Sequence, residues 1–155
     1  MFIIRKMEVT DIPKIWELLQ QLAKETGQGF VDKRTVEGLI KHSRNNLFSG
    51  LVVELQNDLI GVCLYYNKYS EWTGKLVTNI QDLFVCKKHR NKGVARKLLQ
   101  EVHNTTGNCL KLIVVRTNNG AKKFYEKVGF HVRYEEESFH INDKDIEILL
   151  NKEER

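Results

Sequence analysis

The sequence has few of the features that mark secreted, metal-binding or membrane-spanning proteins. Its three cysteines, Cys63, Cys86 and Cys109, lie far apart and lack the spacing of a metal site. Each lies in an apolar run, so we expect buried, reduced thiols. No apolar stretch approaches the roughly 20 residues of a membrane span, and the N-terminus lacks the long apolar core of a signal peptide. These absences predict no metal, no membrane contact and a cytoplasmic location.

Proline is nearly absent as well, and no repeat, linker or low-complexity segment interrupts the chain. The single proline, Pro13, follows Thr10 and Asp11 at a position typical of the first turn of a helix. The chain has 155 residues, of which 41% are hydrophobic and 29% are charged, as in ordinary globular proteins. We therefore expect a single domain over residues 1–151, followed by a charged tail at 152–155.

Alternation and helical periodicity predict a mixture of strands and helices. The expected strands are Phe2–Arg5, Leu47–Leu55, Leu59–Tyr66, Lys75–Cys86, Cys109–Val115, Phe130–Phe139 and Asp145–Leu150. The expected helices run from Ile12 to near Gly27, from Lys33 to about Ser43 with Asp32 as a cap, over the stripe that begins at Val94, and from Asn118 to Gly129. The last two strands would form an antiparallel hairpin.

The stretch from Gln81 to Leu99 organises this pattern, because it reads as a buried strand, a charged turn and an amphipathic helix. The first turn of a helix leaves backbone N–H groups unpaired and carries a partial positive charge. Gly93 lets a ligand approach the main chain closely, and Arg90 and Lys92 add full positive charge. This turn suits a pyrophosphate group, although it matches neither the Walker loop nor the three-glycine dinucleotide fingerprint.

The net charge of +5 is open to several partners: nucleic acid, an acidic surface or an anionic cofactor. Basic residues are mixed with acidic ones almost everywhere, and the densest basic cluster, Lys87–Lys97, coincides with the phosphate-binding turn. One polyanionic cofactor explains that cluster. We therefore expect no nucleic-acid partner.

Two motifs resemble those of the Gcn5-related N-acetyltransferase (GNAT) superfamily. Arg90-x-x-Gly93-x-Ala95 is similar to its acyl-CoA motif, and the segment Asn118–Phe130 is similar to its later Asn-x-x-Ala-x-x-Phe-Tyr-x-x-x-Gly-Phe helix. Tyr69–Gly74 resembles the spermidine/spermine and thialysine acetyltransferase branch. The resemblance implies an α/β (α+β) fold. Its sheet would be mixed and mostly antiparallel, with helices on both faces and a splayed central parallel pair, Gln81–Cys86 and Cys109–Val115.

The resemblance also implies acetyl-CoA as cosubstrate, with its pantetheine arm in the gap between the splayed strands. It assigns cofactor contacts to Leu83, Phe84, Val85, Arg90, Asn91, Lys92, Gly93, Val94, Ala95, Arg96, Asn118 and Ala121. Tyr125 occupies the position of the proton donor for the leaving thiolate, a role that a phenol can perform. Core packing beside Phe124 is the alternative reading of Tyr125.

The residues expected to bind the amine acceptor differ from those of the polyamine-type relatives at one position. Those relatives have Glu-Asp before the apolar run of the central strand, whereas this chain has Gln81-Asp82. Gln81 cannot accept a proton, and Asp82 should point to the opposite face of the strand. We assign both to substrate binding, and His140 is a candidate substitute for the missing base.

The function that these residues imply is acetyl transfer from acetyl-CoA to a primary amine of a small polyamine-like or amino-acid-like molecule. Two alternatives remain: a protein N-terminal or lysine acetyltransferase, and an acyl-CoA-binding regulatory module with little turnover. Family members often dimerise, so a homodimer is expected through the aromatic region around Trp72 or through the terminal strands. The loop Thr26–Val31 is a candidate for acceptor specificity or a plain connection.

Overall fold

The computed structural model describes residues 1–29 and 32–151. The charged tail expected at 152–155 and part of the loop Thr26–Val31 lie outside the described residues. The chain divides into two compact units, Met1–Lys122 and Lys123–Arg155. None of the helices in residues 1–29 and 32–151 has the length and apolar character of a membrane span.

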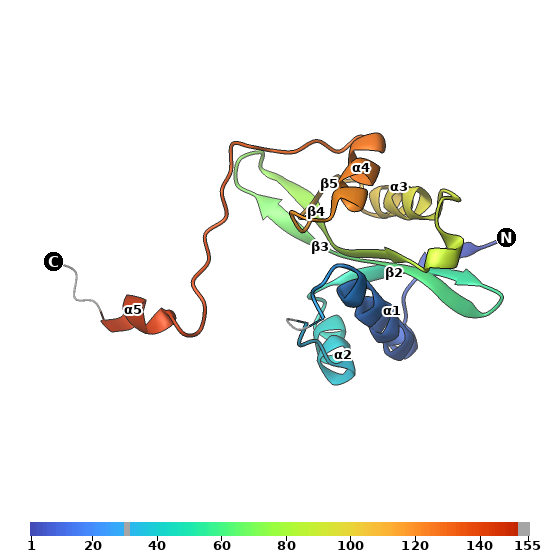
Figure 1. Cartoon of the computed structure of the whole chain (residues 1–155), viewed down its shortest axis with the longest axis horizontal. Coiled ribbons are helices and arrows are strands. Elements are labelled where there is room, and N and C mark those ends of the chain that lie inside the picture. Colours follow the sequence, from blue (N-terminus) through green and yellow to red (C-terminus); the bar gives the residue numbers. More distant parts are fainter. Residues whose placement is uncertain (30–31, 152–155) are drawn as a thin grey trace. The chain divides into compact units, whose positions relative to one another are not determined.

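The first unit contains a five-stranded sheet whose strands lie side by side in chain order (Figure 1). The first four strands pair antiparallel, and the fifth pairs parallel to the fourth. The strands are β1 (Ile3–Lys6), β2 (Ser49–Leu55), β3 (Asp58–Ser70), β4 (Lys75–Val85) and β5 (Cys109–Leu112). This mixed, mostly antiparallel sheet confirms the expected fold class.

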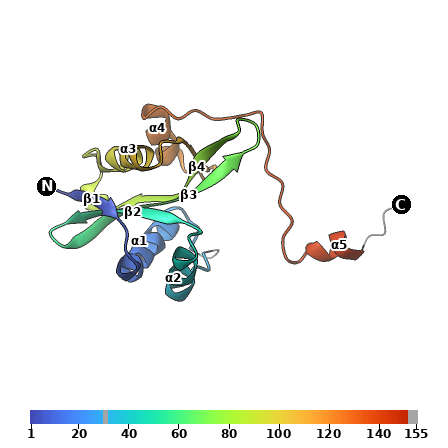
Figure 2. The ribbon, with the colours of Figure 1, turned by 180° about the vertical axis from the view of Figure 1, so that it is seen from behind.

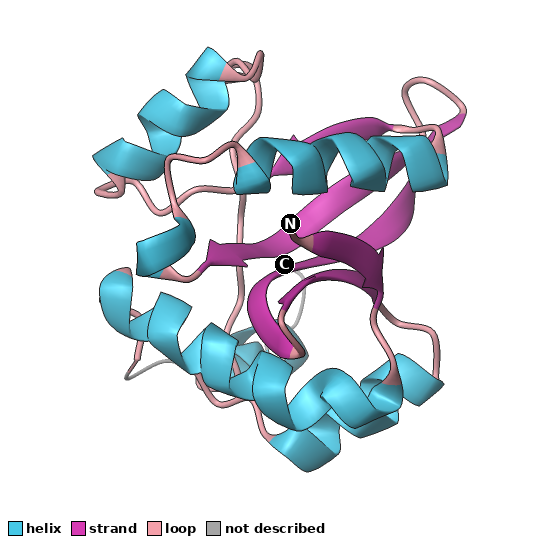
Figure 3. Cartoon of the chain, turned by 90° about the vertical axis from the view of Figure 1, so that its right-hand side faces the viewer, coloured by secondary structure: helices cyan, strands magenta, loops and turns pink. Residues whose placement is uncertain are grey.

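Helices cover both faces of this sheet, as Figure 1 and the reverse view in Figure 2 both show. On one face lie α1 (Ile12–Glu25) and α2 (Val36–Arg44), and on the other lies α3 (Val94–Thr106). The side view in Figure 3 shows the strands between these two layers of helices. The main core lies under α1 and α2 and contains Ile12, Ile15, Leu18, Leu19, Leu39, Val52, Leu59, Val62, Leu64 and Phe84.

Helix α2 begins later than the sequence pattern predicted. Thr35 is its N-cap, because the Thr35 hydroxyl accepts the N–H of Gly38 at 3.0 Å. Asp32, the expected cap, instead accepts hydrogen bonds from the main chain and side chain of Arg34. The expectation that Asp32 caps the helix was therefore wrong, since its carboxylate is engaged by the guanidinium two residues away.

Helix α4 (Asn119–Lys127) carries the chain across the boundary between the units, and the second unit contains a further helix, α5 (Ile146–Asn151). The hairpin predicted for Phe130–Phe139 and Asp145–Leu150 was wrong, since no strand lies among residues 130–151. Two physical reasons account for this. An isolated two-stranded hairpin is only marginally stable, and Glu135–Glu137 place three like charges in the first arm. At Asn142 the chain makes a helical turn instead, since its carbonyl accepts the N–H of Ile146.

Candidate functional site

Strand β4 has a free edge toward the side of β5. It pairs with β3 from Ser70–Lys75 to Gly61–Val85, but it pairs with β5 only over Val77–Ile80. Among the described residues, Gln81–Val85 therefore has no strand partner on its β5 side. The parallel pair that the resemblance implied is present. It is formed by Val77–Ile80 with Cys109–Leu112, and β5 ends before the predicted Val115.

Main-chain groups of Leu83 and Val85 face this free edge. The amide of Cys86 donates to the carbonyl of Ile60 at 2.8 Å, so Cys86 faces β3. Main-chain groups in an antiparallel ladder alternate between the two sides of the strand. The main-chain N–H and C=O of Phe84 therefore also face β3. The main-chain groups of Leu83 and Val85 point to the other side of β4, toward its free edge. Of the three predicted pantetheine contacts, Leu83 and Val85 have the required direction.

Gln81 lies in a β-bulge at the start of the free edge. Leu64 of β3 pairs with Asp82, and the next residue, Tyr65, pairs with Ile80, so no residue of β3 stands opposite Gln81. The Gln81 residue is exposed, whereas Asp82 is buried. A bulge re-aims side chains where a strand changes its partner. The two predicted acceptor residues therefore occupy different environments.

The turn before α3 has accessible backbone N–H groups, which a phosphate site requires. Asn91 and Gly93 adopt positive φ angles of 61° and 76°, and the helix begins at Val94. Lys97 makes the first intrahelical bond, to the carbonyl of Gly93 at 3.0 Å, so the preceding amides lack helical partners. A Cβ atom built on Gly93 would meet no atom within 4 Å. The exposed side chains around this opening are Asn91, Lys92 and Arg96, while Val94 is buried and Ala95 is half-buried.

Arg90 fastens this turn to the rest of the first unit. Its Nε atom donates to the carbonyl of Val85 at 2.7 Å, and a terminal nitrogen donates to the carboxylate of Glu25 at 2.7 Å. The guanidinium carbon lies 5.3 Å from the centre of the Phe84 ring, within cation–π distance. Arg90 thus joins the end of β4 to the end of α1. The contact of Arg90 with a phosphate stays a prediction, because the hydrogen bonds of Arg90 in the structure are to groups of the protein.

A cluster of three charged side chains lies beside Gln81. The Arg34 guanidinium donates to the carboxylate of Asp82 at 2.8 Å and to that of Asp32 at 2.8 Å. The indole N–H of Trp16 donates to the carbonyl of Arg34 at 3.1 Å. The segment before α2 is thereby bound to both α1 and β4.

The pKa values of this cluster record its burial and its pairing. Burial raises the pKa of Asp82, and the positive charge of Arg34 acts against that rise. Hydrogen bonds from Arg34 lower the pKa of Asp32. Burial alone would lower the pKa of Arg34, but the hydrogen bonds and charges of the two carboxylates raise it. The guanidinium therefore stays charged at every physiological pH.

Residues 46–132, more than half of the chain, match the family model described as an acetyltransferase (GNAT) domain.

The chain belongs to the GNAT acetyltransferase family.

The chain is similar to acetyltransferases whose names include an amine. Human spermidine/spermine N(1)-acetyltransferase-like protein 1 is 27% identical over 97% of this chain, which spans only 23% of that relative. Mouse thialysine N-epsilon-acetyltransferase is 29% identical over 81% of this chain and 82% of its own. A predicted acetyltransferase from Clostridium acetobutylicum, solved with acetyl-CoA, has a TM-score of 0.72 at 17% identity and covers 90% of this chain and 96% of its own.

The later GNAT motif forms the start and the body of α4. The Asn118 side chain accepts the N–H of Ala121 at 3.1 Å and so caps the helix, which is a structural use for both residues. Tyr125 belongs to the second unit, where its ring centre lies 5.3 Å from that of Phe124 and 5.5 Å from that of Phe130. The predicted roles of these residues toward acetyl-CoA stay predictions.

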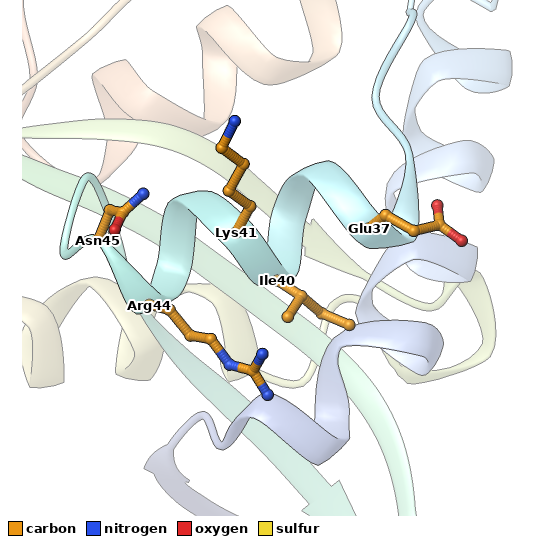
Figure 4. A pocket seen from close by; sticks show the side chains of 5 residues that line it. All are labelled: Glu37, Ile40, Lys41, Arg44 and Asn45. Carbon is orange, nitrogen blue, oxygen red and sulfur yellow. The ribbon is translucent and has the colours of Figure 1, made fainter.

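His140, the candidate substitute base, lies in the second unit and forms a contact of 2.9 Å between its Nε2 atom and the Ser138 hydroxyl. Among residues 1–29 and 32–151, no group of three or more His, Cys, Asp or Glu side chains could hold a metal. A hollow along α2 contains no predicted site residue (Figure 4); it is lined by Glu37, Ile40, Lys41, Arg44 and Asn45.

Sequence reasoning missed the partners of Asp82 and Arg90. Arg34 reaches Asp82 across 48 positions of sequence, and Glu25 reaches Arg90 across 65. A signal for the first pair was present, since an unpaired buried aspartate on a strand requires a cation nearby. Nothing in the local pattern pointed to Arg34 rather than to another basic residue.

Proposed function

We propose that this GNAT protein transfers an acetyl group from acetyl-CoA to a primary amine of a small molecule, by direct attack in a ternary complex. One observation carries the proposal. The free edge at Leu83–Val85 leads, through a turn fastened by Arg90, to the open main chain at Gly93. A strand edge and a helix start arranged in this sequence suit an extended amide chain that ends in phosphates.

Both parts of this path fit acetyl-CoA by their donor chemistry. The amides of the pantetheine arm are able to add to the free edge as a short extra strand. The partners are the carbonyl of Leu83 and the N–H of Val85, since the carbonyl of Val85 already accepts from Arg90. The pyrophosphate suits the unpaired amides at the start of α3, beside the charges of Lys92 and Arg96. The open space at Gly93 leaves room for the phosphate oxygens.

Bound acetyl-CoA supplies an acetyl group that is activated as a thioester. The amide of Leu83 faces the open side of β4 and is a suitable donor to the oxygen that gains negative charge. Tyr125, at the motif position of the family, is our candidate for the proton donor to the departing thiolate. Gln81 and Asp82 stand at the acceptor end, where they would orient the amine.

The proposed acceptor class is a small molecule with a primary amine, in line with the spermidine/spermine and thialysine names of the relatives. A second candidate is an acyl-CoA-binding module with little turnover. It is favoured by Gln81, which cannot accept a proton, and by the engagement of Asp82 with Arg34. A cytoplasmic location and a homodimer remain predictions.

The cofactor site is tested by Gly93→Glu, with Gly107→Glu as a matched control. Both glycines border α3, have φ angles of 76° and 69°, and have free space around a built Cβ. The backbone strain of the two variants should therefore be similar, about 1 kcal/mol each. Only Gly93→Glu places a carboxylate in the proposed pyrophosphate site.

We expect calorimetry to show micromolar binding of acetyl-CoA to the wild type and to Gly107→Glu, and lost binding in Gly93→Glu. Equal affinity in the two folded variants would contradict the cofactor site. Acetyl-CoA consumption with polyamines, amino acids, aminoglycosides and peptides then separates the candidates. Binding without turnover of any amine would favour the second one.

A further inference from the structure

Asp82 lies near Ile80, where the free edge of β4 begins. The reacting group of the cofactor would lie at this point. The pyrophosphate site at Gly93 follows the C-terminal end of β4, and the free edge runs back from there to Ile80, the last residue paired with β5. A chain laid along this edge from the turn therefore has its far end beside Gln81 and Asp82. An acceptor amine must approach this same point.

The carboxylate of Asp82 is not open at this point, because Arg34 covers it. The side chains of Asp32 and Asp82 are 7% and 9% exposed, whereas the Arg34 side chain is 27% exposed. The guanidinium is thus the accessible member of the cluster. Three of its nitrogens donate to the two carboxylates, and the indole of Trp16 holds the Arg34 carbonyl.

The cluster keeps one net negative charge, since two carboxylates share a single guanidinium. A cation that approaches Asp82 is attracted by this residual charge, but it also meets the positive charge of Arg34. One ammonium group balances the remaining charge of the cluster. A second ammonium on the same molecule would find both carboxylates already engaged, and it would lose part of its hydration without a partner.

Resting on the proposed acetyltransferase function, we infer that Arg34 is a specificity-determining residue: a resident cation that takes the place of a second ammonium and selects acceptors with one positive charge over diamines and polyamines. Asp32 holds Arg34 in this position through the main-chain and side-chain bonds of Arg34. The acceptor is therefore a monocationic alkyl amine, despite the polyamine names among the relatives.

The charge of the cluster is adjustable by single substitutions. Arg34→Gln removes the positive charge, Asp32→Asn removes the charge of one carboxylate without a change of size, and Arg34→Lys keeps all three charges. The probes are n-butylamine and putrescine, which share one carbon chain and differ by one ammonium group. The measured quantity is the ratio of their affinities, because a general loss of stability would affect both amines alike.

We expect the putrescine-to-butylamine affinity ratio to rise about tenfold in Arg34→Gln, in line with the unmasking of one buried charge. The ratio should fall in Asp32→Asn and stay near that of the wild type in Arg34→Lys. A ratio that is unchanged in all three variants overturns the inference. If Arg34→Gln does not fold, Asp32→Asn against Arg34→Lys decides the question by the same criterion.

Two readouts separate this inference from the proposed function. Calorimetry measures the affinity ratio on the protein alone and with CoA, and it needs no turnover. Acetyl-CoA consumption by the wild type is measured in parallel, with the same two amines. Absent CoA binding would contradict the proposed function, whereas an unchanged ratio contradicts only the role of Arg34.

Discussion

At the scale of single residues, Gln81 has the largest consequence for chemistry. It lies at a bulge on an exposed strand position, beside the buried Asp82, and its amide cannot accept a proton. An alkyl amine has a pKa of about 10, so it is mostly protonated near neutral pH and lacks a free lone pair. We therefore expect an acetyltransferase with Gln81 to use the minor neutral form of its acceptor, unless another side chain accepts the proton.

We predict that kcat/KM with one alkyl amine keeps rising toward alkaline pH in the wild type. Gln81→Glu adds a proton acceptor, so it should raise turnover near neutrality and move the rising limb to lower pH. Gln81→Met, which has no charge and a similar size, is the control and should leave the limb in place. A wild-type plateau near neutral pH would show that another base acts, and His140 and Asp82 would be the next positions to change.

Tyr125 differs from Gln81 because its expected role comes from a motif and its ring also packs with Phe124 and Phe130. We predict that Tyr125→Phe lowers kcat about 10-fold or more and leaves the affinity for acetyl-CoA nearly unchanged. The ring and its packing survive this substitution, so only the hydroxyl is tested. Phe124→Leu is a packing control. Steady-state kinetics that show equal kcat in Tyr125→Phe and in the wild type would make Tyr125 a packing residue.

At the scale of elements, Arg5 joins β1, β2 and the start of α1. It donates to Glu54 of β2 at 2.8 Å and to both carboxylate oxygens of Asp11, at 2.8 and 2.9 Å. Asp11 also accepts the N–H of Glu8 at 2.7 Å. The hydrogen bonds from Arg5 are the main cause that lowers the pKa of Asp11 below its ordinary value.

A lowered carboxyl pKa makes stability depend on pH in a definite direction. The contribution of Asp11 is fully present above its unfolded value of 3.8 and is lost as the pH falls through the lower folded value. We predict that Asp11→Asn lowers the free energy of unfolding at pH 7 by about 1–2 kcal/mol and flattens its fall as the pH drops below the unfolded value of 3.8. Urea titrations at several pH values measure both effects.

Asp58→Asn is the control for this prediction. Asp58 pairs with Lys14 at 3.4 Å, but its side chain is 58% exposed, and exposed pairs contribute little. Its substitution should change the stability at pH 7 by less than about 0.5 kcal/mol. Equal effects of Asp11→Asn and Asp58→Asn would contradict the structural role of the Arg5 contacts.

At the scale of the whole molecule, charge is arranged around segments that meet only after folding. The ends of the connection between α1 and α2 are both held by ion pairs, Glu25 with Arg90 and Arg34 with Asp82. Asp82 lies in β4 and Arg90 lies in the turn before α3. The proposed acceptor and cofactor regions of the first unit are thus each bound by an ion pair to a residue at one end of this connection.

Local sequence patterns were sufficient to identify the family and to place most elements of the first unit. Periodicity located α1, α3 and the three longer strands of the sheet, β2, β3 and β4, because a buried face repeats every 3.6 or 2 residues whatever the rest of the chain does. Motif spacing identified the turn at Gly93, since its backbone needs are local. The residues predicted to bind the cofactor around this turn follow from the same local motif.

The contacts between distant side chains, and the segments that form strands, depend on how the chain folds in space. The partners of Asp82 and Arg90 are 48 and 65 positions away, and a charge selects its partner by proximity in space. Strand β5 ends at Leu112, so the edge of β4 beyond Ile80 has no strand beside it among the described residues. Residues 130–151 contain no strand. A strand exists only with a neighbour to receive its hydrogen bonds, so alternation in a sequence is not sufficient to form one.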